Sequence, residues 1–209
     1  MPLAHYIKVT KTARYFTIGA LTETTKEVWF VLHGYAQLAQ DFINDFEVLN
    51  DGSRFIVAPE GLNKFYAKGF GGKPAANWMT SESRETEIDD YVNYLNTLYT
   101  ALNIPSTVKV NVLGFSQGVA TSSRFIHFTP HKIDAFMIYA GELAAELINP
   151  VSEKLKALPI TYLTGNNDPF ITPEKHKVVF DLMHQLNAKI ITFDGGHEIK
   201  PEVLLQIVK

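Results

Sequence analysis

The stretch VLGFSQGVA, residues 112–120, is the most informative part of this sequence. The apolar residues that precede it predict a buried strand, and the small residues after it allow a helix to pack closely on that strand. Ser116 stands between Gly114 and Gly118, where a sharp bend leaves little room for a Cβ atom. The stretch is therefore either a tight turn that presents a reactive serine or a structural turn that contains one.

Composition limits the possible functions. The chain has 209 residues, of which 46% are hydrophobic, a net charge of −3 and no cysteine. This length and hydrophobic content fit one domain over residues 1–209. The slight negative charge argues against nucleic acid or an anionic membrane surface as a partner. Without cysteine there is no disulfide, no thiolate catalysis and no cysteine metal site.

Targeting and membrane signals are not evident. The first residues, MPLAHYIKVTKTARYF, lack the apolar core of a signal peptide. No apolar run approaches the roughly 20 residues that a membrane span needs. We therefore expect a cytoplasmic protein without integral membrane contact.

The order of predicted elements is that of an α/β fold. Residues 6–10 and 14–18 are rich in β-forming residues and predict an N-terminal antiparallel hairpin. Further strands are predicted at 28–32, 54–58, 108–113, 135–139, 160–163 and 189–193. Helices are predicted near 41–49, 87–102, 117–128, 150–157, 173–187 and 201–208, and residues 60–76 are the least regular segment. We expect a mostly parallel sheet with helices on both faces.

A reactive serine at the end of a strand needs a base and an acid. A serine hydroxyl is too weak a nucleophile to attack an acyl carbon unaided. In folds that present the serine on such a strand-to-helix turn, the catalytic residues follow one another in the chain as Ser, then Asp or Glu, then His. His197 follows the last predicted strand and Asp168 follows the penultimate one, where functional groups gather in parallel sheets. Asp194 is the rival acid, but its closeness to His197 favours a role in fixing the loop. We predict Ser116, Asp168 and His197 as the catalytic residues.

The oxyanion formed in such a reaction needs two backbone N–H donors. One is predicted at Gln117, which follows the nucleophile and begins a helix. The other is predicted at Tyr35, in the loop that follows the strand at 28–32. His33, in the same loop, is expected to be structural and to pack under the site.

Six segments, in order, carry a family resemblance: LHGY, VAPEG, NWM, GFSQG, GNNDPF and GGHEI. Over residues 28–209 the chain resembles the phospholipase/carboxylesterase family of α/β-hydrolases, which includes small bacterial carboxylesterases and acyl-protein thioesterases. The resemblance implies an α/β-hydrolase fold and a Ser-Asp-His acyl hydrolase that uses no metal and no cofactor. It departs from the family at Tyr35, where leucine often follows His-Gly.

The substrate is less clear from the sequence. We predict contacts from Trp78, Met79, Phe70 and Phe170, although each is equally compatible with core or loop packing. The GFGGK stretch at 69–73 lacks the spacing of a phosphate loop. No segment is long enough for a large lid, so we expect a small-molecule ester of short to medium acyl chain as substrate. The alternatives are a thioesterase or lysophospholipase and, from another class, a non-catalytic binding protein of the same fold.

Overall fold

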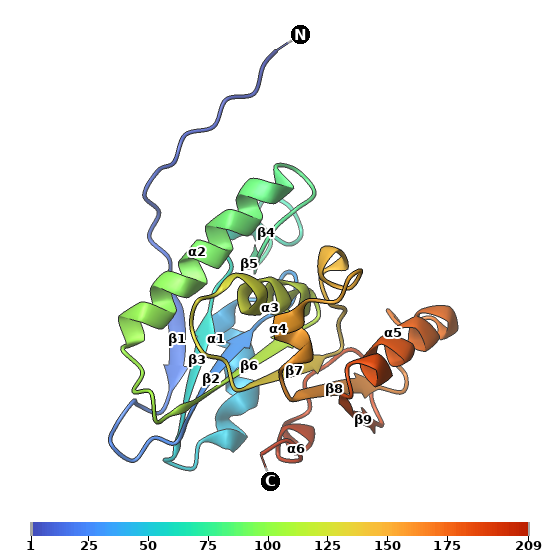
Figure 1. Cartoon of the computed structure of the whole chain (residues 1–209). Helices are drawn as coiled ribbons and strands as arrows, with labels where there is room; N and C mark the ends of the chain where they lie inside the picture. Colours follow the sequence, from blue (N-terminus) through green and yellow to red (C-terminus); the bar gives the residue numbers. More distant parts are fainter. Residues whose placement is uncertain (1, 209) are drawn as a thin grey trace.

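A mixed sheet of seven strands, in the order β1-β3-β2-β6-β7-β8-β9, forms the centre of the molecule (Figure 1). The computed structural model describes residues 2–208, so Met1 and Lys209, the ends of the expected domain, lie outside the described residues. The strands are β1 (Tyr15–Ile18), β2 (Glu27–Leu32), β3 (Arg54–Pro59), β6 (Lys109–Phe115), β7 (Ala135–Tyr139), β8 (Ile160–Gly165) and β9 (Lys189–Phe193). All neighbouring pairs are parallel except β1 with β3.

The sequence of β2 illustrates why the sheet is buried on both faces. Phe30 and Leu32 belong to one hydrophobic cluster, whereas Trp29 and Val31 belong to another on the opposite face. Side chains alternate between the two faces of a strand, so a continuous apolar run indicates that both faces are covered. The prediction of a parallel strand from this run is confirmed.

Helices cover both faces, as expected (Figure 1). One cluster includes side chains from α2 (Arg84–Leu102), α3 (Gln117–Phe128), the short helix η2 (Ala145–Leu147), α4 (Glu153–Lys156) and α5 (Pro173–Gln185). The other includes side chains from α1 (Ala39–Phe42), η1 (Ile43–Leu49) and α6 (Pro201–Leu204). The sheet therefore has a hydrophobic core on each side, which is the arrangement of a doubly covered α/β fold.

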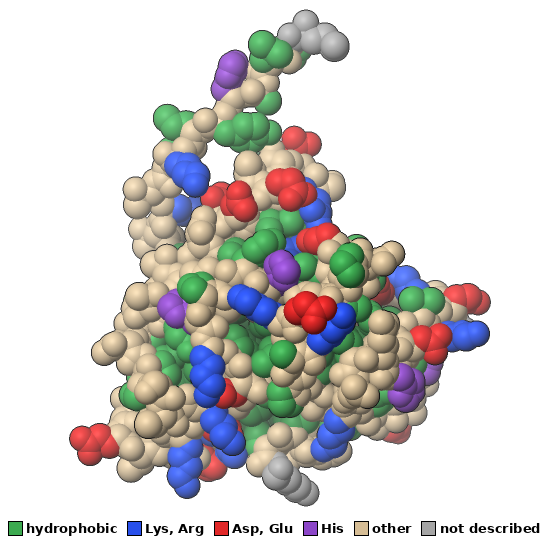
Figure 2. All heavy atoms as spheres, viewed as in Figure 1, with side chains coloured by type: hydrophobic (Ala, Val, Ile, Leu, Met, Phe, Trp, Pro, Cys, Tyr) green, Lys and Arg blue, Asp and Glu red, His purple; other side chains and the backbone are tan. Residues whose placement is uncertain are grey.

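The N-terminal hairpin is a correction to the sequence analysis. An antiparallel strand is present, but β1 pairs with β3, with Tyr15 opposite Pro59, and residues 6–10 form no strand. Tyr6 and Ile7 are exposed, and Figure 2 shows this segment standing away from the body of the molecule. A two-stranded hairpin has little apolar surface to bury, whereas pairing with β3 places β1 beside the core. Strand-forming composition predicted β1, but tertiary packing chose its partner.

Residues 60–76, expected to be irregular, contain a second, two-stranded sheet. Strand β4 (Asn63–Tyr66) pairs antiparallel with β5 (Pro74–Asn77). Gly69 and Gly71 adopt φ values of 71° and 89° in the connecting loop, which glycine permits at no steric cost. An isolated bridge joins Ala76 to Gln37 and so ties this hairpin to the loop after β2.

The connection from β7 to β8 is short. Residues 140–159 contain only η2 and α4 as helical segments, which agrees with the expectation of no large lid. None of the helices within residues 2–208 combines the length and the apolar character needed to cross a membrane.

Candidate active site

Ser116 lies at a sharp turn between β6 and α3. Its backbone has φ 53° and ψ −119°, a conformation that costs energy for a residue with a Cβ atom. The two flanking glycines are sterically required: a Cβ atom on Gly114 would lie 2.5 Å from the Gly118 carbonyl oxygen, and one on Gly118 would lie 2.7 Å from that of His33. This geometry is that of a nucleophile elbow, in which strand and helix approach closely and the serine projects from the turn.

His197 and Asp168 form a hydrogen-bonded pair. The imidazole Nδ1 donates to Asp168 Oδ2 over 2.7 Å, and the aspartate side chain is fully buried. The other carboxylate oxygen, Oδ1, accepts from the Phe170 amide over 2.9 Å. With Nδ1 engaged as a donor, Nε2 of the neutral ring is left as the acceptor, which is the tautomer that a general base needs.

The loops that carry these two residues are joined by backbone hydrogen bonds. The Asn166 amide donates to the Phe193 carbonyl oxygen over 3.0 Å, and the Asn167 amide donates to that of Gly195 over 2.9 Å. A Cβ atom on Gly165 would collide with the Gly195 and Gly196 carbonyl oxygens. The close approach permitted by this glycine brings the segment after β8 against the segment after β9.

Aromatic contacts hold the His197 ring beside the elbow. Its centroid lies 4.9 Å from that of Phe115, the residue before Ser116, and 4.6 Å from that of Phe170. Ser116, Asp168 and His197 follow the carboxyl ends of β6, β8 and β9. The structure thus brings the residues predicted to act together to one edge of the sheet, where ligands of parallel sheets bind.

The predicted oxyanion residues flank Ser116. A Cβ atom on Gly34 would lie 3.1 Å from Ser116 Cβ, so the loop before Tyr35 passes directly beside the serine. The Gly34 amide donates to Gln37 Oε1 over 2.7 Å, which orders this loop. Gln117 is the first residue of α3, and an amide in this position has no acceptor within its own helix and lies at the positive end of the helix dipole.

The side chain of Gln117 has a separate role. Its Oε1 accepts from the Trp78 amide over 3.2 Å, and its Nε2 donates to the Met79 carbonyl oxygen over 3.0 Å. These bonds attach the start of α3 to the segment after β5. The Gln117 contacts were not predicted, because they join chain segments that are distant in sequence. The Gln37 contact is local, but no residue pattern in the sequence indicated it.

His33 is fully buried, as expected for a structural residue. Its Nε2 accepts from the Gly61 amide over 3.0 Å, and its Nδ1 donates to the Gly34 carbonyl oxygen over 2.7 Å. The ring stacks on Trp78 at 5.0 Å, and burial lowers the pKa of His33 to about 4. A ring with both nitrogens engaged and no exposed surface supports the loop that carries Gly34 and Tyr35, and it has no free nitrogen to act as a second base.

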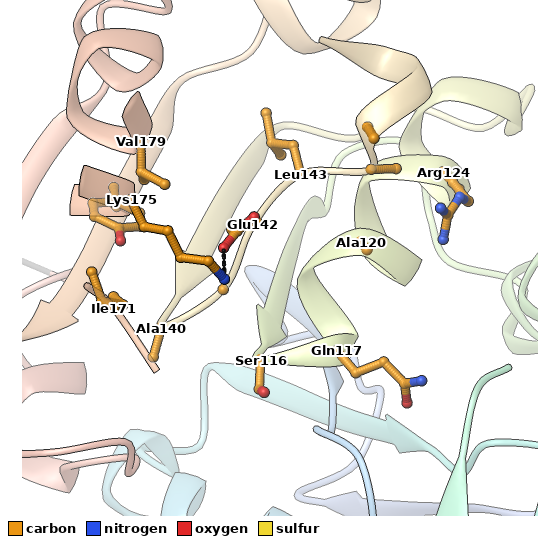
Figure 3. A pocket seen from close by; sticks show the side chains of 14 residues that line it. Ser116, Gln117, Ala120, Arg124, Ala140, Glu142, Leu143, Ile171, Lys175 and Val179 are labelled. Atoms are coloured by element: carbon orange, nitrogen blue, oxygen red, sulfur yellow. Dashed lines mark hydrogen bonds and ion pairs between the residues drawn. The ribbon is translucent and has the colours of Figure 1, made fainter. Parts of the chain in front are cut away.

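A pocket of about 310 Å³ opens beside Ser116 (Figure 3). Its walls come from α3, from the segment after β7, from β8 and from α5, and they are lined by Ala120, Arg124, Ala140, Leu143, Tyr162, Ile171, Lys175 and Val179, among others. None of the predicted contact residues Trp78, Met79, Phe70 and Phe170 is among its lining residues. The walls of this pocket therefore come from chain segments other than the four residues for which substrate contact was predicted.

The four predicted contact residues have other surroundings. Trp78 is buried and donates from Nε1 to the His33 carbonyl oxygen over 2.8 Å. The sulfur of Met79 lies 3.6 Å from Arg124 Nη1. Phe70 is fully exposed in the loop between β4 and β5, and Phe170 is 66% exposed with its ring edge on His197. Trp78 is thus a packing residue, and the ring of Phe170 contacts the ring of His197.

The rival acid Asp194 and three further histidines make contacts outside this constellation. Asp194 Oδ1 accepts from Asn167 Nδ2 over 3.3 Å, a contact within the loops and not with His197. His127 contacts Ser152, His131 contacts Thr100, and His176 stacks on Phe180. The part of the chain that the structure describes contains no cluster of three or more His, Cys, Asp or Glu side chains suited to a metal ion.

Comparison with known proteins agrees with this geometry. The family model described as Serine hydrolase (FSH1) matches residues 24–202. The chain belongs to the FSH1 serine hydrolase family. Family membership establishes it as a hydrolase, and the resemblance to the α/β-hydrolases deduced from the sequence motifs is confirmed. No curated protein sequence matches the chain.

Solved structures with the same fold are distant in sequence from this FSH1-family protein. Acyl-protein thioesterase 2 of Zea mays is 19% identical, with 94% of this chain and 96% of that chain covered and a TM-score of 0.71. A phospholipase/carboxylesterase from Dyadobacter fermentans is 18% identical, with 96% of both chains covered and a TM-score of 0.65. Esterase PE8 is also 18% identical, with 95% of this chain and 98% of that chain covered and a TM-score of 0.72. These similarities establish the α/β-hydrolase fold.

Proposed function

We propose that this FSH1-family protein is a serine esterase that hydrolyses carboxylic esters of short to medium acyl chains through an acyl-enzyme on Ser116. The observation that carries the proposal is the His197–Asp168 pair, packed against the residue before a serine in a strained turn. A buried acid, a histidine in the correct tautomer and a projecting serine are the parts of an acyl-transfer site. A binding module has no use for this combination.

Each residue has a defined part in the proposed reaction. His197 Nε2 removes the Ser116 hydroxyl proton as the serine oxygen bonds to the acyl carbon. The backbone N–H groups of Tyr35 and Gln117 donate to the oxyanion, and Asp168 orients the imidazole and stabilises its charged form. The alcohol leaves with the proton from His197, and a water molecule repeats the sequence to release the acid.

The size of the pocket supports a preference for short to medium acyl chains. Its volume of about 310 Å³ is near the lower end of the ~300–1,000 Å³ range of small-molecule sites. Each methylene of the acyl chain that is buried against the apolar walls contributes roughly 0.8 kcal/mol to the binding free energy. Affinity therefore rises with chain length only until the chain extends beyond the pocket. We expect kcat/KM for p-nitrophenyl esters to rise over the first few carbons and to stop rising before twelve.

The test of the proposal is hydrolysis of p-nitrophenyl acetate by the wild type and by Ser116→Ala. Loss of the nucleophile should lower kcat on the order of 10⁴-fold or more, with an unchanged circular dichroism spectrum. Ser122→Ala is the matched control, because this serine is also in α3 and its buried Oγ has no hydrogen-bond partner among the described residues. Turnover by Ser116→Ala at the level of the control would refute the assignment.

The same assay separates the alternatives. We expect an acyl thioester of equal chain length and a lysophospholipid to be poorer substrates than the ester. Hydrolysis of the thioester is measured by the release of its thiol. A kcat/KM for the thioester more than tenfold above that of the ester would favour a thioesterase. No turnover of any of these substrates would favour a binding protein.

A further inference from the structure

Two chain segments with apolar side chains form walls of the pocket beside Ser116. One wall is the segment after β7, with Ala140 and Leu143, and the other comes from α5 and the residues before it, with Ile171 and Val179 (Figure 3). An acyl chain attached to Ser116 would lie between these walls, where its methylenes contact apolar side chains.

Two basic side chains line this pocket, and their surroundings differ. Arg124 is buried; its guanidinium donates to both oxygens of Glu146 and to the Tyr91 hydroxyl. The charge of Arg124 is thus already satisfied inside the protein. Lys175 is more than half exposed and its Nζ lies 3.3 Å from Glu142 Oε1.

The ion pair between Glu142 and Lys175 connects the two walls. Glu142 belongs to the segment after β7, and Lys175 belongs to the first turn of α5. In Figure 3 the lysine reaches from α5 towards this segment, and the contact lies in this view between Ser116 and the end of the pocket with Leu143 and Val179. A cation in the first turn of a helix is opposed by the helix dipole, so Lys175 depends on Glu142 for a favourable position.

We propose that the Glu142–Lys175 ion pair is a strap across the acyl pocket that sets the chain length accepted by the enzyme, an inference that rests on the proposed esterase function. A short acyl chain fits on the Ser116 side of the strap. A longer chain passes the strap only when the two charged groups separate. Because an exposed ion pair changes an equilibrium constant by about fivefold at most, the strap discriminates between esters without blocking long ones.

The test is the ratio of kcat/KM for p-nitrophenyl decanoate to that for p-nitrophenyl butyrate, measured below the micelle range. Lys175→Gln and Glu142→Gln should each raise this ratio about three- to fivefold. The double variant should raise it no further, because both changes remove the same interaction. Lys156→Gln is the matched control, since Lys156 forms an exposed ion pair with Glu153 on α4, and its ratio should equal that of the wild type.

Salt gives a second readout. Raising NaCl to about 0.5 M screens an exposed pair, so the ratio should rise in the wild type and much less in the double variant. An unchanged ratio in both single variants, or effects that add in the double variant, would overturn the strap while leaving the esterase intact. Absence of any ester turnover by the wild type would overturn both proposals.

Discussion

The Nδ1 atom of His197 lies 2.7 Å from Oδ2 of Asp168, and the carboxylate is completely shielded from solvent. A buried carboxylate with a single donor on each oxygen has few alternative arrangements. The Phe170 amide occupies Oδ1, so Oδ2 is directed at the histidine. The pair therefore fixes both the orientation and the tautomer of the imidazole.

This relationship predicts different effects for two neighbouring acids. Asp168→Asn presents an amide to Nδ1, which favours the wrong tautomer, and should lower kcat for p-nitrophenyl acetate by about 10⁴-fold. Asp194→Asn is the matched change, because Asp194 contacts Asn167 and not His197, and its effect should be less than about tenfold. A larger loss in the Asp194 variant would show that the acid is misassigned.

The edge of the sheet that carries Ser116, Asp168 and His197 could be predicted because its signals are local. Gly114 and Gly118 are required by contacts within the elbow and with the end of β2. Asp168 and His197 follow predicted strands directly, so the rule for parallel sheets places them together. These inferences need the order of elements and not the packing of side chains.

The pocket could not be predicted in the same way. Lys175 reaches the site from α5, in a segment that the helical pattern alone describes as an amphipathic surface helix. The hairpin at β4 and β5 is held by a bridge to Gln37, which no local pattern indicates. The aromatic residues Trp78 and Phe70 attracted a substrate-binding interpretation, yet one is a core residue and the other is exposed. Tertiary contacts decide which side chains line the pocket.

A substitution at Gly118 tests the geometry of the turn that carries Ser116. Gly118→Ala places a methyl group against the carbonyl oxygens of Leu32 and His33, so α3 must move away from the end of β2. Overpacking of this kind costs typically ~1–3 kcal/mol and should also displace the oxyanion loop. The free energy of unfolding in urea and the turnover of p-nitrophenyl acetate should both decrease.

The control for Gly118 is Gly52→Ala. Gly52 has φ 83° and no atom within 4 Å of the position that a methyl group would take, so the cost of the change is backbone strain of about 1 kcal/mol. Its turnover should match that of the wild type. Equal turnover in the two variants would contradict the close approach of α3 and β2.

Gln37 predicts a positioning effect on catalysis. Its Oε1 accepts from the Gly34 amide over 2.7 Å, immediately before the proposed donor Tyr35. Gln37→Ala removes this support, and a shift of about 1 Å in an oxyanion donor lowers kcat by up to about 10²-fold. The KM for a short ester should change much less, because the loop does not line the pocket beside Ser116.

Gln40→Ala is the matched control for this change. Gln40 follows shortly after Gln37 in the chain, within α1, and its side chain is exposed, so its substitution should leave kcat as in the wild type. A Gln37→Ala variant with wild-type kcat would show that the loop is held by other contacts.

The buried His33 should make the free energy of unfolding depend on pH. Burial lowers its pKa from 6.5 to about 4 in the folded protein, whereas the unfolded chain binds the proton near pH ~6.5. Between these values the unfolded state holds more protons, so the free energy of unfolding falls as the pH is lowered through this window. The full contribution is present above pH ~6.5, and about 3 kcal/mol is lost by pH ~4.

Urea unfolding between about pH 6.5 and 4.5 measures this slope above the ordinary pKa values of aspartate and glutamate side chains. Arg124 holds the pKa of the Glu146 carboxyl at about 2. The stability that this ion pair contributes is therefore lost at lower pH than the contribution of His33. His33→Gln cannot titrate and should unfold with a nearly constant free energy over this interval, even if it is less stable throughout. His5→Gln removes an exposed histidine and should retain the wild-type slope. A wild-type stability that does not vary over this pH interval would contradict a neutral, buried His33.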